Sequence, residues 1–271
     1  MKARLNPTQR GLVATAITIV FVLLVLPLML IVSLAFSQGI AAFWHAFIDA
    51  DMQHAIRLTL LVAIITVPIN LVFGILLAWC VTHYRFKGRQ LLMTLIDIPY
   101  ATSPVVAGLC YLVVYGAESY FGQWLMDHDI QLMFAWPGLV MVTLFVTSPF
   151  IARLLIPLMQ EQGSDQEQAA LTLGANGWQI FYLVTLPKIK WGLLYGVILC
   201  NARAIGEFGA VSVVSGAIRG QTLTLSLLVE QLSADHKVVG AFTAALLLAS
   251  MALITVVVKS ILEKSQPQLS R

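Results

Sequence analysis

Apolar residues occur along this chain in six long runs, separated by short polar segments. Each run is close to the roughly 20 residues that an α-helix needs to cross the hydrocarbon core of a bilayer. The runs predict spans at Leu12–Phe36, Ile56–His83, Leu91–Gly116, Pro137–Met159, Trp191–Val214 and Val239–Leu262. The pattern therefore predicts an all-α, polytopic membrane protein with about six transmembrane helices.

The composition supports the same class. Of 271 residues, 59% are hydrophobic and 11% are charged, whereas soluble domains carry about 25% charged residues. One compact soluble core cannot enclose so much apolar surface, so we expect a single membrane domain over residues 1–271 in a lipid bilayer. The net charge of +3 is small, and we attribute it to membrane topology rather than to nucleic-acid binding.

Lys and Arg residues gather at alternate ends of the predicted spans, which sets the orientation by the positive-inside rule. The basic ends hold Lys2, Arg4, Arg10, Arg85, Lys87, Arg89, Arg153, Lys188, Lys190, Lys259, Lys264 and Arg271. The loop Ala117–Trp136 on the other side has no Lys or Arg. Both termini and the loop Ser164–Pro187 are therefore predicted to be cytoplasmic. The first run is longer than the apolar region of a signal peptide, so we expect a retained signal-anchor.

The loop 164–187 has the local chemistry of two short helices. Ser164 and Glu167 fit a capping box, and Gly174 suits the left-handed position that ends a helix. Asn176 and Gln179 repeat the capping pattern. Pro187 is expected to stop the second helix, because the residue before a proline avoids the α conformation.

Small residues on the first of these helices favour a docking role. A bare connector between two spans needs neither paired caps nor the exposed pair Ala169 and Ala170. Small residues on a short helix suit the groove of a partner protein. A plain surface hairpin remains the alternative on physical grounds alone.

A charged patch interrupts the fifth apolar run at Asn201, Arg203 and Glu207. A charge at the centre of a bilayer costs about 2.5–3.5 kcal/mol on insertion scales. Arg203 and Glu207 are four residues apart, so they share a helix face and can pair. Two interpretations stay open: a structural ion pair between helices, or residues that line a permeation route.

The third run contains a second candidate for such a route. Asp97 precedes Pro99 and is expected to be a buried acid, with a structural hydrogen bond or a pathway role. Ser103 begins the segment Ser103–Gly108, in which a proline and small residues allow a kink and close helix approach.

The loop also resembles the conserved cytoplasmic loop of permeases from binding-protein-dependent ABC importers. That pattern is Glu-Ala-Ala, three residues, Gly, nine residues, Ile-x-Leu-Pro. Ala169, Ala170, Gly174, Leu186 and Pro187 match it, Val184 replaces Ile, and Gln168 stands at the Glu position with Glu167 one residue earlier. The resemblance implies the type I ABC importer permease fold, with a core region at 56–262. It also implies a coupling helix at 164–187 whose contact residues for an ATPase are Glu167, Gln168, Ala169, Ala170, Gly174, Leu186 and Pro187.

Further segments are similar to the W-type permeases of bacterial sulfate/thiosulfate importers: Asp97–Pro99, Ser103–Gly108, Asn201–Gly209 and Val214–Gly220. This resemblance implies a subunit in the bacterial inner membrane that pairs with a T-type permease. Its further implied partners are two cytosolic ATP-binding subunits and a periplasmic sulfate/thiosulfate-binding protein. Apart from this resemblance, the residues' own chemistry and their places within the spans make Asn201, Arg203, Glu207, Asp97 and Ser103 the candidate pathway residues.

The chain contains no Gly-x-x-x-x-Gly-Lys-Ser/Thr phosphate loop, so we expect no enzyme activity and no cofactor here, with ATP bound by the partner subunits. A molybdate/tungstate permease is the alternative within the same family. A secondary transporter is a further alternative, although no internal repeat is visible. An intramembrane enzyme is disfavoured, because the spans lack known catalytic motifs.

Overall fold

The computed structural model describes residues 6–264, which form helices joined by short loops. The predicted cytoplasmic residues Lys2, Arg4 and Arg271 lie outside this range. The first half comprises α1 (Pro7–Val20), the π-helix η1 (Phe21–Val25), α2 (Leu26–Ala35), α3 (Gly39–Ile48), α4 (Ala50–His83), α5 (Arg89–Ala101), α6 (Pro104–Tyr115), α7 (Tyr120–Asp127) and α8 (Trp136–Thr147). The second half comprises α9 (Pro149–Gln162), α10 (Asp165–Thr172), α11 (Gly177–Ile180), the π-helix η2 (Phe181–Thr185), α12 (Leu186–Ile205), α13 (Gly209–Ser215), α14 (Leu225–Ala234) and α15 (Val238–Lys264).

The prediction of about six membrane spans is confirmed. Within the described residues, five helices are long and apolar enough to cross a bilayer, and a bent pair supplies a sixth. The five are Thr8–Ala35, Ala50–His83, Trp136–Gln162, Gly177–Ile205 and Val238–Val258. The bent pair is α5 with α6.

The third span is broken rather than merely kinked. The chain bends by 107° between α5 and α6. Thr102 and Ser103 between them are extended, with ψ of 142° and 134°. Pro104 imposes this break, since it has no N–H to donate and it disfavours the α conformation at Ser103.

The fifth span differs from its predicted range of 191–214 at both ends. Pro187 does not stop the helix, because the π-helical turn η2 precedes it and the Leu186 N–H donates to the Phe181 carbonyl. This wider turn lets the chain continue from α11 through η2 into α12 without the N–H that proline lacks. At the other end α12 stops at Ile205, and α13 begins separately at Gly209.

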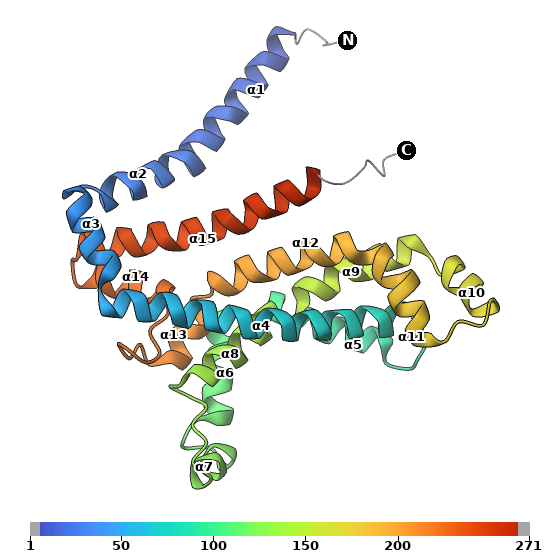
Figure 1. The fold of residues 1–271 in the computed structure, drawn as a ribbon. Coiled ribbons are helices and arrows are strands. Elements are labelled where there is room, and N and C mark those ends of the chain that lie inside the picture. Colours follow the sequence, from blue (N-terminus) through green and yellow to red (C-terminus); the bar gives the residue numbers. More distant parts are fainter. Residues whose placement is uncertain (1–5, 265–271) are drawn as a thin grey trace.

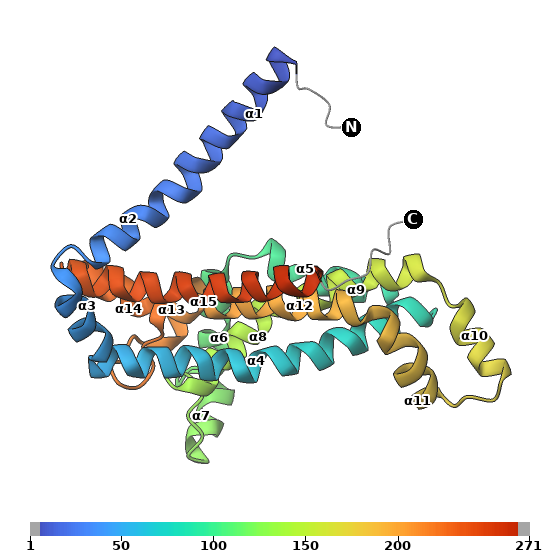
Figure 2. The same cartoon turned by 45° about the horizontal axis from the view of Figure 1, so that its top comes forward.

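Helix α4 is the central packing element of the bundle, with contacts to α8, α9 and α12. Figures 1 and 2 show α4, α12 and α15 with roughly parallel axes, with α10 and α11 at one end of the bundle and α3 at the other. Gly74 of α4 faces Ile151 of α9, and Asn70 of α4 donates from Nδ2 to Thr147 Oγ1 over 2.7 Å. The small residue and the buried amide hold α4 close to α8 and α9.

The N-terminal span stands apart from the bundle. Helix α2 packs against α15, while α1 projects away, as Figure 2 shows. None of the apolar window in this span is buried within the chain. Such a surface must be covered by lipid or by another chain.

Candidate functional site

An elbow of two short helices, α10 and α11, projects from the bundle where α9 ends and α12 approaches (Figure 1). Gly174 ends the first helix with φ of +85°, as the left-handed capping position requires. The second cap is also confirmed, because Asn176 Oδ1 accepts the Gln179 N–H at 2.9 Å and Gln179 Oε1 accepts the Asn176 N–H at 2.8 Å. The sequence therefore encodes the elbow locally.

The predicted capping box at Ser164 and Glu167 is wrong. The Ser164 hydroxyl makes no capping bond and accepts instead from Gln168 Nε2 at 2.9 Å. Glu167 turns toward the membrane domain and is 8% exposed. Its Oε2 lies 2.5 Å from His83 Nε2, and its Oε1 accepts the Thr185 hydroxyl at 2.5 Å. A buried partner, Thr185, and a partly buried one, His83, together outweigh one solvent-exposed cap.

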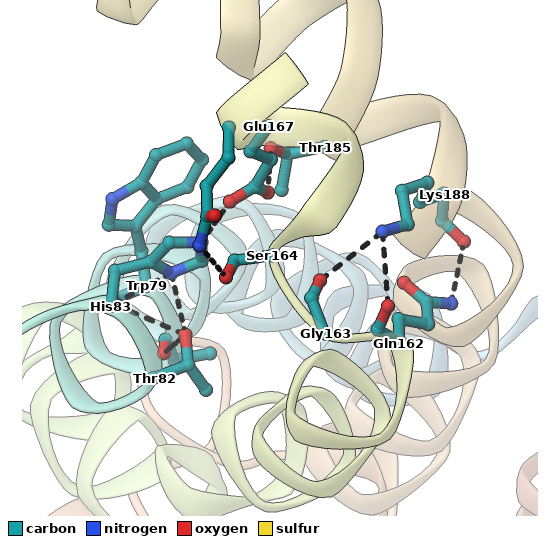
Figure 3. Close-up of polar contacts among 11 residues, drawn as sticks. Trp79, Thr82, His83, Gln162, Gly163, Ser164, Glu167, Thr185 and Lys188 are labelled. Atoms are coloured by element: carbon teal, nitrogen blue, oxygen red, sulfur yellow. Dashed lines mark hydrogen bonds and ion pairs between the residues drawn. The ribbon is translucent and has the colours of Figure 1, made fainter. Parts of the chain in front are cut away.

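Figure 3 shows how His83 presents its imidazole to Glu167. The ring stacks on Trp79 with centroids 4.7 Å apart, and its Nδ1 lies 2.8 Å from the Thr82 hydroxyl. Trp79 in turn contacts the Phe181 ring at 5.1 Å. Glu167 therefore connects three elements: the end of α4, the elbow helix α10 and the π-helix η2.

A second connection joins the end of α9 to the start of α12. Lys188 Nζ donates to the carbonyls of Gln162 and Gly163 at 3.4 Å, and Gln162 Nε2 donates to the Lys188 carbonyl at 3.2 Å. These contacts are drawn on the right of Figure 3. The elbow is thus fixed to the bundle at both of its ends.

The elbow exposes several apolar side chains. Leu173 is 88% exposed, and Leu171, Trp178 and Leu183 are also exposed. Of the sequence-predicted contact residues, Gln168, Ala169 and Gly174 are exposed and Ala170 is half-buried. Leu186 and Pro187 lie apart from this tip, at the start of α12. Glu167, by contrast, is buried and faces the membrane domain.

The charged patch of the fifth span lies at the end of α12. The expected pairing is confirmed, with Arg203 Nη1 2.6 Å from Glu207 Oε2. Glu207 is 2% exposed, and its Oε1 accepts the Ala210 N–H at 3.0 Å, which caps the start of α13. The Ser226 hydroxyl donates to the Glu207 carbonyl at 2.8 Å. Asn201, two residues before Arg203 on the same helix, is half-buried.

Asp97 is not the buried acid that the sequence suggested. Its Oδ1 accepts from Arg153 Nε at 2.7 Å, and the two side chains are 44% and 54% exposed, respectively. Arg153 is presented by α9, and its guanidinium lies 4.8 Å from the centroid of the Tyr100 ring. Ser103 is exposed at the break between α5 and α6. Asp97 and Ser103 therefore share one broken span, but no described contact joins them to Arg203 or Glu207.

Sequence reasoning missed two functional candidates, His83 and Arg153. Both were assigned to the cytoplasmic ends of spans, and their partners are far along the chain. Neither contact leaves a signal at short sequence separation. Among residues 6–264, no group of three or more His, Cys, Asp or Glu side chains is arranged to hold a metal ion.

Comparisons with known proteins place this geometry in a family. The family described as "Binding-protein-dependent transport system inner membrane component" matches residues 70–270. The "Sulfate transport system permease protein CysW" of Escherichia coli (strain K12) is 59% identical over 90% of this chain and 83% of its own length. The "Sulfate transport system permease protein CysT" of the same strain is 36% identical over 89% of this chain and 87% of its own length.

A solved structure shares the fold at low identity. It is that of a bacterial ABC transporter involved in the import of the acidic polysaccharide alginate, with a TM-score of 0.80 at 17% identity over 96% of both chains. The predicted type I ABC importer permease fold is thereby confirmed. The chain belongs to the family of binding-protein-dependent transport system inner membrane components.

Proposed function

We propose that this chain is the W-type permease subunit of an ATP-driven sulfate/thiosulfate importer in the bacterial inner membrane. The observation that carries the proposal is the 59% identity to the CysW protein of E. coli over 90% of the chain. Molybdate and tungstate are tetrahedral dianions like sulfate, but both permease relatives described above are named for sulfate. Sulfate is therefore the favoured passenger, with thiosulfate as a second.

The proposed assembly contains a second, T-type permease. The chain is also 36% identical to the CysT protein, over 89% of its length, which supports a heterodimer of two similar subunits. Two cytosolic ATP-binding subunits and a periplasmic binding protein for sulfate and thiosulfate complete the complex. This chain lacks a phosphate-binding loop, so we assign ATP binding and hydrolysis to the partner subunits and no cofactor to this chain.

In this proposal the elbow is the coupling helix. The exposed side chains of Leu171 and Leu173 suit an apolar groove on an ATP-binding subunit, together with Gln168, Ala169, Ala170 and Gly174. Because Glu167 bonds both His83 and Thr185, a displacement of α10 is passed to α4 and, through η2, to α12. Leu186 and Pro187 form the joint at which that displacement enters α12.

The same helix leads to the proposed pathway. Arg203 and Glu207 lie at the far end of α12 from η2, so movement of the elbow reaches the charged patch along one continuous span. We assign the pathway to Asn201, Arg203, Glu207, Asp97 and Ser103. In Figure 1 the described end of α15 points toward the side that carries the elbow, which supports cytoplasmic placement of both.

Reconstitution of the purified complex into proteoliposomes tests this proposal. We expect sulfate uptake that requires both internal ATP and the loaded binding protein, and co-purification of this chain with the ATP-binding subunits. Uptake by this chain alone, driven by an ion gradient without ATP, would contradict the proposal and favour a secondary transporter.

A further inference from the structure

The ion pair between Arg153 and Asp97 lies inside a membrane span and remains open to its surroundings. Arg153 is about 14 Å along α9 from its end at Gln162, at 1.5 Å per residue, within a span of 27 residues. Its side chain is 54% exposed in the isolated chain, and that of Asp97 is 44% exposed. Charges so placed are costly against lipid, so this face borders water or another subunit.

The guanidinium of Arg153 is held in place on one side, while most of its N–H groups make no hydrogen bond to the described residues. Only its Nε donates to Asp97 Oδ1, at 2.7 Å, and the group lies 4.8 Å from the Tyr100 ring centroid. Within the described part of the chain, the two terminal nitrogens of Arg153 donate no hydrogen bond to protein. Those nitrogens form the planar fork that binds tetrahedral oxyanions through paired hydrogen bonds.

The surroundings of Arg153 suit a passing anion. A hollow of about 300 Å³ borders the pair, lined by apolar residues such as Ile96 and Ile156. Tyr100 is close enough to both Arg153 and Arg203 to interact with them electrostatically, so cations from α9 and α12 act on the same region. Fixed cations beside an apolar wall attract an anion more strongly than they would in water, because the local dielectric constant is lower.

We propose that Arg153 is an anion-binding residue of the translocation route, which contacts the tetrahedral oxyanion through its two terminal nitrogens. Asp97 acts as a positioning residue, because it fixes the Nε side and directs the free edge away from α5. The Asp97 carboxylate also limits how tightly an anion binds, and a conducting site must release what it binds. This inference rests on the proposed function as an oxyanion importer.

Substitutions in the complete complex test the assignment. Arg153→Gln should lower sulfate flux about tenfold or more, since it removes charge-assisted hydrogen bonds, while binding-protein-stimulated ATP hydrolysis persists. Arg153→Lys should restore part of the flux. Arg57→Gln is the matched control, because Arg57 is exposed on α4 without an ion-pair partner in the described residues; it should keep wild-type flux.

Asp97→Asn gives a readout that a merely structural role would not produce. We expect radiolabelled sulfate to bind the purified complex more tightly than wild type, while maximal flux falls. The assignment is overturned if Arg153→Gln matches Arg57→Gln, or if Arg153→Gln releases the second permease subunit, which would make Arg153 a subunit contact. A wild-type complex without ATP-driven sulfate uptake would instead refute the proposed function.

Discussion

His83 Nε2 and Glu167 Oε2 lie 2.5 Å apart, and they join the C-terminal end of α4 to the helix α10. The two residues are 84 positions apart in the chain. The same carboxylate accepts the Thr185 hydroxyl, so one buried side chain ties the elbow to two membrane spans. The acidic residue of the loop therefore points toward the membrane domain, and Gln168 occupies the exposed position beside it.

Replacing Glu167 with Gln should uncouple ATP hydrolysis from transport. The substitution keeps the size of the side chain but removes the charge that strengthens both hydrogen bonds. Coupling energies between sites are typically about 1–3 kcal/mol, so sulfate moved per ATP should fall about fivefold or more. Glu161→Gln, at an exposed position near the end of α9, serves as the control, and equal transport ratios in the two variants would refute the connection.

Leu173 tests the docking surface of the elbow. It is 88% exposed on the tip after α10, so Leu173→Asp should leave folding intact and weaken association with the ATP-binding subunits about tenfold or more, as expected for an apolar interface anchor. The measurement is the affinity of the purified permease pair for those subunits. Tyr120→Ala, which alters a 96% exposed residue on α7, should leave this affinity unchanged; a shared loss would indicate a global effect.

Two glycines that face the same isoleucine give a test of packing. A Cβ at Gly74 would lie 2.7 Å from Ile151 Cβ, whereas a Cβ at Gly196 would lie 3.5 Å from Ile151 Cα. Gly74→Ala should therefore destabilise the protein by about 1–3 kcal/mol, as overpacking does, and Gly196→Ala should be nearly neutral. The midpoints of thermal unfolding in detergent compare the variants, and equal midpoints would show that α4 and α9 can move apart at little energetic cost.

Glu207 lies in the short break between α12 and α13, yet we expect it to contribute strongly to the stability of the fold. Glu207→Ala removes both the ion pair with Arg203 and the cap on the Ala210 N–H, and leaving such partners unsatisfied costs about 1–3 kcal/mol. Glu207→Gln keeps a carbonyl for the cap and should cost less. Unfolding in detergent checks the order, and a stable Glu207→Ala variant would favour a role outside folding.

Local signals account for much of the fold. Span number, the Gly174 ending and the Asn176 cap depend on residues close in sequence, and the structure agrees with all of them. The i, i+4 pair of Arg203 and Glu207 is local in the same sense.

The errors arose where distant residues compete with local rules. Glu167 makes no local capping bond, because in the folded chain its carboxylate bonds to His83 and Thr185 instead. Asp97 was expected to be buried, yet Arg153 from α9 holds it at an open surface. Pro187 was read as a helix stop, but the π-helical turn η2 removes the conflict. Such contacts depend on how spans pack, which hydrophobic periodicity does not specify.

The central claim, that this chain serves sulfate import, is tested most directly by radiolabelled sulfate uptake in cells that lack the chain. The intact complex is restored in a parallel culture, and unlabelled thiosulfate and molybdate are added as competitors. We predict that uptake is lost with the chain, returns with it, and is blocked by thiosulfate but not by molybdate. Sulfate uptake that continues unchanged without the chain would contradict the claim and point to a different oxyanion.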